Sequence, residues 1–168
     1  MHIIQNEVGA RFSSPAGAIV TISKSAISEM VSAARLKGDW ETGGILIGRY
    51  SDDLSCALIE SATRAPWDSN AGPNWFVRGK FGLRRLLNKN WGGGRYYVGE
   101  WHSHPNFDPS PSADDIRAIQ RIARDWSYAC ERPILAIVGG SFTYNPLISV
   151  TLGARTGEAQ RLRGGASG

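Results

Sequence analysis

One run of fourteen residues, from His102 to Asp115 (HSHPNFDPSPSADD), constrains the fold of this chain more than any other segment. The apolar and aromatic run before it, YYVGEW at 96–101, predicts a strand that ends in two histidines. Residues i and i+2 of a strand share a face, so His102 and His104 project side by side, roughly 6.6 Å apart along the chain. Two imidazoles at that spacing can converge on one metal ion.

The same segment ends in SADD, residues 112–115, where a serine is followed three residues later by an acid. This pattern predicts the start of a helix, with Ser112 as N-cap and Asp115 in the first turn. Asp115 is then a candidate third ligand, and two histidines with one carboxylate leave a fourth position for water. A Ser-x-x-Asp alone is most often a simple capping box, and a His-x-His alone is more often no ligand pair. Their combination, across a loop stiffened by three prolines, favours a metal site.

Hydrolysis at such a site needs a base, and the candidate is Glu41. This acid stands just before TGGILIG, where a Gly-Gly pair opens a short apolar strand and allows backbone to approach a metal closely. Taken alone, a glutamate at such a position is more often an exposed surface residue. Both interpretations stay open from the residues themselves.

These residues together resemble the JAMM motif of the JAB/MPN metalloprotease domain, over roughly residues 17–152. The resemblance implies that His102, His104 and Asp115 bind one Zn²⁺ per chain. It implies that Glu41 is the general base and that Ser112 donates a hydrogen bond at the catalytic centre. Members with this complete motif are zinc isopeptidases or peptidases that act on ubiquitin-like modifiers, and members without it are scaffolds. The intact motif favours an enzyme.

Residues 65–87 and the run YYVGEWHSHP resemble a narrower group, the small bacterial JAB deconjugases encoded with E1- and E2-like enzymes in antiphage operons, including CBASS. This resemblance implies hydrolysis of the amide bond after the C-terminus of a ubiquitin-like protein or a cGAS-like nucleotidyltransferase conjugated to a target. Two alternatives remain. One is a zinc peptidase that processes a sulfur-carrier or another small protein tail, and the other is a non-catalytic MPN scaffold module.

The connection that carries Trp67, Asn74, Trp75 and Phe76 is rich in aromatic residues. Aromatic anchors with small polar neighbours suit a groove for an extended peptide, and residues 74–77 could add that peptide as an extra strand. Alternatively, Trp75 and Phe76 cap the core while Trp67 covers a helix. The resemblance favours the substrate groove, because insertions near this position contact modifiers in deubiquitinating relatives.

The order of predicted elements gives an α+β fold with a mixed, mostly antiparallel central sheet flanked by helices. This is also the helix–sheet–helix sandwich of the JAB/MPN domain, similar to that of cytidine deaminases, which the resemblance implies. Strands are expected at 17–22, 43–50, 54–62, 74–78, 95–103, 133–138 and 146–152, and helices at 23–37, 80–90 and 112–129. One domain is expected over residues 1–154. A flexible, dispensable tail is expected over 155–168, although it contains RLRGG at 161–165, the string that ends ubiquitin.

Length and composition fit one compact enzyme, because 168 residues with 42% hydrophobic content suffice for a single core. No apolar run is long enough to span a membrane or to direct export, so a cytoplasmic protein is expected. Cys56 and Cys130 lack a CxxC spacing and are expected to be core thiols. Basic residues such as Lys80, Arg84 and Arg85 are predicted to form a solvated helix face, so nucleic acid is not an expected partner.

Overall fold

The computed structural model describes residues 8–165. The strands are β1 (Val8–Ser13), β2 (Ile19–Ser23), β3 (Gly43–Tyr50), β4 (Cys56–Ala62), β5 (Asn70–Gly72), β6 (Trp75–Val77), β7 (Tyr96–Ser103), β8 (Ile134–Ser141), β9 (Asn145–Leu152), β10 (Gln160–Arg161) and β11 (Arg163–Gly164). The helices are α1 (Lys24–Lys37), α2 (Leu83–Trp91) and α3 (Ala113–Arg124), followed by a short 3-10 turn, η2 (Trp126–Tyr128).

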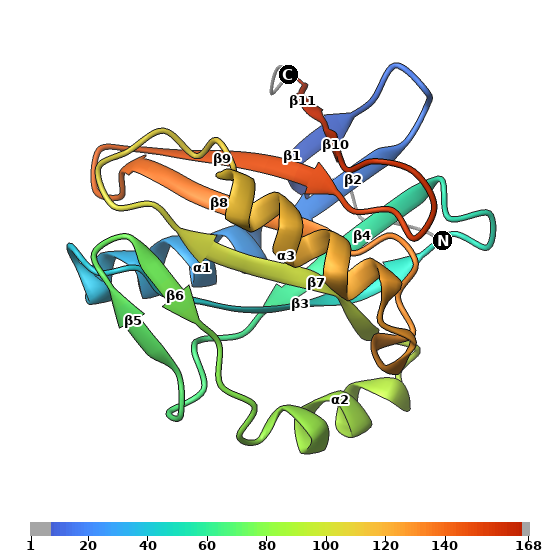
Figure 1. Cartoon of the computed structure of the whole chain (residues 1–168), viewed down its shortest axis with the longest axis horizontal. Coiled ribbons are helices and arrows are strands. Elements are labelled where there is room, and N and C mark those ends of the chain that lie inside the picture. The colour runs from blue at the N-terminus through green and yellow to red at the C-terminus, as the bar shows by residue number, and fades with distance from the viewer. Residues whose placement is uncertain (1–7, 166–168) are drawn as a thin grey trace.

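Nine strands form one sheet in the order β10-β9-β8-β7-β3-β4-β2-β1-β11, and β5 pairs with β6 in a separate hairpin (Figure 1). Within the large sheet, β2 pairs with β4 and β7 with β8 in parallel, and the other neighbours are antiparallel. The helix α1 lies behind the sheet in Figure 1 and α3 lies in front of it. The predicted α+β fold with a mostly antiparallel sheet between helices is therefore confirmed.

The two faces of the sheet are distinguished by alternate residues of β8. Ala136 and Val138 belong to the main core, which includes the buried face of α1. Leu135 and Ile137 instead pack with Ile119 of α3 in a second cluster. In the parallel register of β7 and β8, His102 stands beside Ile137. The side chain of His102 therefore points to the face that α3 covers.

Sequence explains where α1 and α3 begin. Ser23 caps α1, because its hydroxyl accepts a hydrogen bond from the Ala26 amide at 3.0 Å. Ser112 caps α3 in the same way, as predicted. The helix predicted over 112–129 ends earlier, at Arg124, because Asp125 takes an extended conformation and its carboxylate then caps the 3-10 turn.

Three expectations need correction at the periphery of the fold. β1 is an additional strand, which its sequence does not reveal because among its residues only Phe12 is buried. The extended piece expected at 74–78 is confirmed as β6, but it pairs with a strand that was not expected, β5. Cys130 is buried as predicted, whereas Cys56 is exposed at the start of β4, so the prediction of a core thiol is wrong there.

The C-terminal segment is part of the sheet, so the prediction of a flexible tail is wrong for residues 160–165, here named the C-terminal strap. β10 pairs with β9, and β11 pairs with β1. Between them, Leu162 is 4% exposed and joins the main core. Its amide donates to the carbonyl oxygen of Val150 at 2.9 Å. The strap thus joins the two outermost long strands, and residues 166–168 of the expected tail lie outside the described residues.

Candidate metal centre

β7 and α3 bring three potential metal ligands together. His102 lies in β7, His104 follows the end of this strand, and Asp115 lies in the first turn of α3. The Nε2 atom of His102 is 3.2 Å from Nε2 of His104 and 3.2 Å from Oδ1 of Asp115. The Nε2 atom of His104 is 3.5 Å from Oδ2 of Asp115. The side chains meet as the sequence predicts, and their binding of a metal stays a prediction.

This set of donors fits a zinc ion. Tetrahedral zinc holds its nitrogen and oxygen ligands at about 2.0–2.2 Å, so two neighbouring ligand atoms lie roughly 3.3–3.5 Å apart. The observed separations of 3.2–3.5 Å are close to that requirement, with the two histidines facing different oxygens of Asp115, Oδ1 and Oδ2. Three protein ligands rather than four are typical of catalytic sites, in which the remaining position is open.

Glu41 lies beside this cluster because β3 pairs with β7. The Thr42 amide donates to Oγ of Ser103 at 3.0 Å, and the Ser103 amide donates to the Thr42 carbonyl at 2.8 Å. The Glu41 amide donates to the Gly72 carbonyl at 2.9 Å, which ties the same residue to the β5–β6 hairpin. Glu41 is 8% exposed, so its interpretation as an exposed surface acid is wrong.

Gly43 permits the close packing that places Glu41. A Cβ atom on Gly43 would lie 2.2 Å from the carbonyl oxygen of Trp101 and 2.7 Å from the ring of Phe76. It would also lie 3.0 Å from Cβ of His102. Any larger residue would therefore push the ligand strand or the hairpin away from Glu41, which gives a steric reason for glycine after the base.

Burial and mutual contacts shift the pKa values of the cluster. Burial raises the pKa of Glu41, while positive charge on His102 and His104 acts against this shift. A hydrogen bond with Asp115 raises the pKa of His104. Burial also acts to raise the pKa of Asp115, but hydrogen bonds with both histidines outweigh it, and the pKa falls well below its usual range. Asp115 therefore remains a carboxylate, the form that binds metal.

Ser112 orients the third ligand through a capping box. Its Oγ accepts from the Asp115 amide at 3.1 Å, and Oδ2 of Asp115 accepts from the Ser112 amide at 2.7 Å. The predicted capping box is confirmed. Because Oγ acts as acceptor in the cap, the hydroxyl proton of Ser112 can still donate elsewhere. The role of that proton at a catalytic centre stays a prediction.

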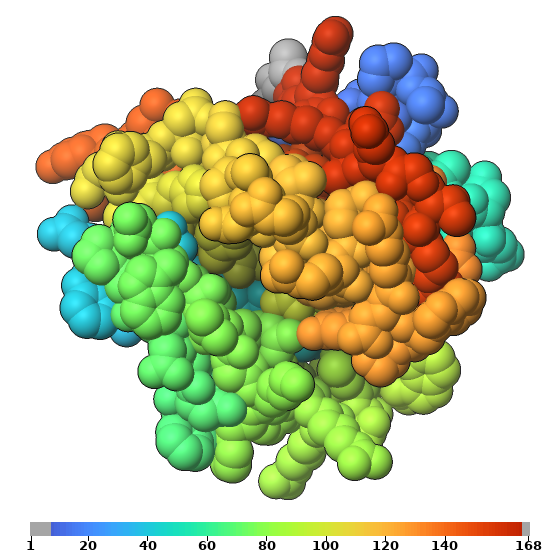
Figure 2. Space-filling model, in the orientation of Figure 1, coloured from blue at the N-terminus to red at the C-terminus, as the bar shows by residue number. Residues whose placement is uncertain are grey.

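The cluster lies in a groove of about 760 Å³ between the β5–β6 hairpin and α3. Figure 2 shows this face of the molecule hollowed between the green hairpin and the yellow-to-orange α3. Glu41, the three potential ligands and Ser112 line the groove, as do the predicted substrate-binding residues Asn74, Trp75 and Phe76.

Comparison with known proteins decides the family. A family model described as prokaryotic homologues of the JAB domain matches residues 23–153. The chain belongs to this family. The match includes Glu41, the histidine pair and the Ser112-x-x-Asp115 cap, so the whole groove described above belongs to the JAB domain.

Named relatives of this JAB domain are peptidases. A protein of Enterobacter hormaechei subsp. hoffmannii (strain UCI 50), named CD-NTase/cGAS isopeptidase, is 47% identical over 144 residues, covering 86% of this chain and 80% of its own. A protein of the same name from Pseudomonas aeruginosa (strain BWHPSA011 / Pa011) is 33% identical over 61% of this chain and 64% of its own. A probable metalloprotease of Sinorhizobium fredii (strain NBRC 101917 / NGR234) is 26% identical over 73% and 76%. This JAB domain is therefore a peptidase or isopeptidase.

A protein of similar fold has a solved structure. A protein of Desulfitobacterium hafniense, solved in solution, superposes with a TM-score of 0.57 at 23% identity, over 84% of this chain and 88% of its own. That likeness shows the fold alone. Across residues 8–165, none of the helices combines the length and apolar character that a membrane crossing requires.

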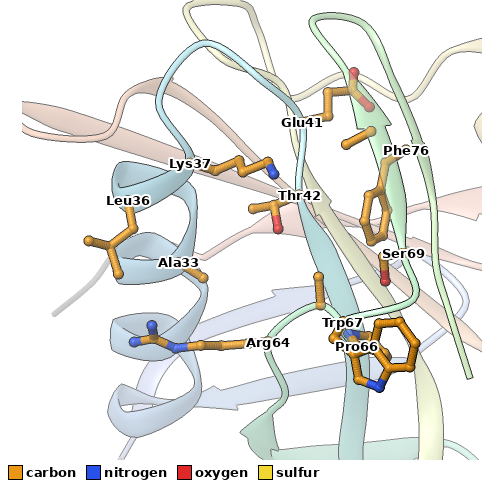
Figure 3. Close-up of a pocket in the computed structure, with 12 residues that line it drawn as sticks. Ala33, Leu36, Lys37, Glu41, Thr42, Arg64, Pro66, Trp67, Ser69 and Phe76 are labelled. Atoms are coloured by element: carbon orange, nitrogen blue, oxygen red, sulfur yellow. The ribbon is translucent and has the colours of Figure 1, made fainter. Parts of the chain in front are cut away.

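Trp67 lies apart from the metal groove. It lines a neighbouring pocket of about 340 Å³ between α1 and the hairpin, which shares only Glu41 and Phe76 with the groove (Figure 3). Trp67 is 76% exposed and packs edge-on against Phe81, with ring centroids 5.4 Å apart. Trp67 thus lines a different pocket from Asn74 and Trp75, which line the groove with the metal ligands. Its binding of substrate stays a prediction.

The far part of the groove was not expected from the sequence. Ile122 of α3 and Leu135 of β8 line it, beside a partly buried ion pair between Arg78 and Glu100. Nε of Arg78 lies 2.6 Å from Oε2 of Glu100, and the Tyr97 hydroxyl donates to Oε1 at 2.8 Å. The ion pair fixes the end of the hairpin to β7. Isoleucines at every third position of α3 were the available signal for its apolar wall.

Proposed function

We propose that this JAB domain is a zinc-dependent isopeptidase that hydrolyses the amide bond after the C-terminus of a conjugated modifier. The modifier we favour is a cGAS-like nucleotidyltransferase (CD-NTase), because the Enterobacter relative is named for that activity and is 47% identical. The observation that carries the proposal is the meeting of His102, His104 and Asp115 beside the buried Glu41. The activity would reverse ubiquitin-like conjugation in the cytoplasm during antiphage defence.

His102, His104 and Asp115 would hold the zinc, which when bound polarises a carbonyl and lowers the pKa of water to about 7. Glu41 would accept a proton from the attacking water and return it to the leaving amine. Burial raises the pKa of Glu41 toward the working pH that suits both steps, and the positive charge of a bound zinc would act against that shift. The Ser112 hydroxyl would donate to the oxygen of the attacked carbonyl as negative charge develops there.

The edge of β6 would hold the modifier tail as an added strand. Within residues 8–165, β6 pairs only with β5, so its other edge has backbone groups free for a peptide in the adjoining groove. Asn74, Trp75 and Phe76 line the groove from this side. Backbone pairing would give affinity for an extended tail, and side-chain pockets would give specificity.

The far wall of the groove would select an apolar side chain in that tail. Seven positions separate Asp115 from Ile122, which is about 10 Å along a helix. An extended peptide covers this length with roughly three residues. Ile122 lies at that distance from Asp115 along α3, and Leu135 lines the same groove, so an apolar residue about three positions before the cut would contact them.

The direct test is cleavage of a CD-NTase joined through its C-terminal carbonyl to green fluorescent protein. We expect a chelator to stop cleavage, added zinc to restore it, and mass spectrometry to locate the cut directly after the last CD-NTase residue. A fusion with a sulfur-carrier tail is the matched control substrate. Cleavage of the control alone would contradict the proposed substrate. A chain that binds no added zinc and cleaves neither fusion would contradict the zinc-dependent enzyme.

A further inference from the structure

The loop between β7 and α3, residues 104–112 and here named the metal loop, is fixed at several points by neighbouring strands. The His104 amide donates to the Val138 carbonyl at 2.8 Å. The Gly140 amide donates to the Phe107 carbonyl at 2.7 Å. The hydroxyl of Ser149 in β9 donates to the Pro109 carbonyl. The loop is therefore held from the β8–β9 side as well as from its ends.

Contacts inside the metal loop reach the ring of His104. Its Nδ1 atom lies 3.3 Å from the carbonyl oxygen of Asp108, so a proton on Nδ1 would donate there and leave Nε2 for a metal. The Asp108 carboxylate in turn accepts from the amide of Ser110 at 2.8 Å and from its hydroxyl. The turn at 108–110 thereby sets the position of the carbonyl that orients His104.

The C-terminal strap touches this turn. Nη1 of Arg161 donates to Oγ of Ser110 at 2.8 Å. The backbone of Arg161 is fixed by pairing with Thr151 of β9, and the next residue, Leu162, is buried in the core. Arg161 is thus a side chain on an anchored strand that reaches across to a turn carrying a potential metal ligand.

We propose that Arg161 is a positioning residue for the metal site, acting through Ser110 and Asp108 on the orientation of His104. The proposal rests on the proposed function only in that His104 binds zinc. It assigns to the RLRGG segment a role in holding the metal loop. The segment lies in the sheet of its own domain and is not a tail offered to the active site.

The expected effect is moderate. Changing the residue that directly orients a metal-binding histidine commonly weakens metal affinity 10- to 100-fold. Arg161 reaches His104 only through two intervening residues, Ser110 and Asp108, so we expect its loss to weaken zinc affinity about 3- to 10-fold. Turnover at saturating zinc should change less than the zinc dissociation constant, because none of the reacting groups is removed.

The test uses four variants of the full chain: Arg161→Ala, Arg161→Lys, Ser110→Ala and the double variant Arg161→Ala/Ser110→Ala. Arg163→Ala is the matched control, since Arg163 is an exposed arginine of the same strap. Zinc dissociation constants are measured by competition with a chromophoric chelator. The absorption spectrum of the cobalt-substituted protein reports the ligand geometry independently of activity.

Weaker zinc binding and an altered cobalt spectrum in Arg161→Ala, but not in Arg163→Ala, would support the proposal. Partial rescue by Arg161→Lys and a double variant no weaker than Ser110→Ala would support coupling through Ser110. Equal zinc affinity in Arg161→Ala and Arg163→Ala would overturn it, and if Arg161→Ala does not fold, unchanged affinity in Ser110→Ala would do the same. Failure of the unmodified chain to bind zinc would instead contradict the proposed function.

Discussion

The metal site and the C-terminal strap acquire their structures in opposite ways. Most of the metal site comes from one strand–loop–helix segment, in which the capping box of Ser112 and Asp115 and the histidine pair are close in sequence. The strap is ordered by two strands distant in sequence, β1 and β9, and by the burial of Leu162. The metal ligands and the buried anchor of the strap therefore lie in different parts of this domain, which meet where Arg161 contacts Ser110.

The largest effect is expected from Glu41→Gln, which should reduce turnover without reducing stability. Turnover should fall by about 10²-fold or more, because proton transfer by a placed side chain commonly contributes 10²–10⁴-fold. Zinc content should not change, since Glu41 is outside the ligand set. The free energy of unfolding should not fall, because the amide places no charge in a buried position. Steady-state cleavage assays, elemental analysis and urea unfolding measure the three quantities.

Glu29→Gln is the matched control for this change, because Glu29 is a partly exposed acid of α1 paired with Arg64. Its turnover should equal that of the unmodified chain. Near-normal turnover of Glu41→Gln with zinc present would remove Glu41 from the mechanism.

The opposite pattern is expected from Leu162→Ala in the strap. The free energy of unfolding of the metal-free protein should fall by about 2–5 kcal/mol, as for other buried leucines. The folded fraction of Leu162→Ala should keep most of the turnover of the unmodified chain at saturating zinc. Leu36→Ala is the control: Leu36 is 74% exposed, and its loss should change stability by at most about 0.5 kcal/mol. Equal unfolding curves for both variants would mean that the strap is not part of the folded core in solution.

Substitution of Ser112 should change both stability and turnover, because this residue caps α3 and is also predicted to donate a hydrogen bond at the catalytic centre. Ser112→Ala should lower the free energy of unfolding by about 1 kcal/mol through loss of the N-cap and should also lower turnover. Ser112→Gly should restore stability to within a few tenths of a kcal/mol, because glycine is tolerated at an N-cap. Turnover should stay low in both variants, since both lack the hydroxyl. Recovery of turnover in the glycine variant would show that Ser112 acts only as a cap.

The smallest effect concerns the two cysteines. Burial raises the pKa of the Cys130 thiol to about 12, so at pH 8 it stays protonated as well as covered. Cys56 is exposed. Iodoacetamide at pH 8 should therefore label one thiol per native chain, at Cys56, without loss of turnover. Peptide mass mapping identifies the labelled residue. Labelling of both Cys56 and Cys130 is expected only when the chain is unfolded in urea.

The metal site could be predicted from the sequence, whereas the C-terminal strap could not. The meeting of the two histidines with Asp115 and the cap at Ser112 follow from local rules, and they appear in the structure as expected. The place of Glu41 beside them follows from one family motif, whereas the packing of Gly43 against Trp101 and Phe76 was not expected. The strap could not be predicted, because two-residue strands carry no periodicity and glycine with arginine is also the composition of mobile tails. The burial of Leu162 depends on β1 and β9, whose positions no local pattern specifies.

Zinc stoichiometry shows whether His102, His104 and Asp115 hold a metal ion. Elemental analysis of the purified chain should give one zinc per molecule, and the His102→Ala/His104→Ala variant should contain none, because a single carboxylate cannot hold the ion. The variant should still fold, as circular dichroism would show, since the main core lies on the other face of the sheet. Full zinc occupancy in this double variant, with the fold intact, would contradict the account.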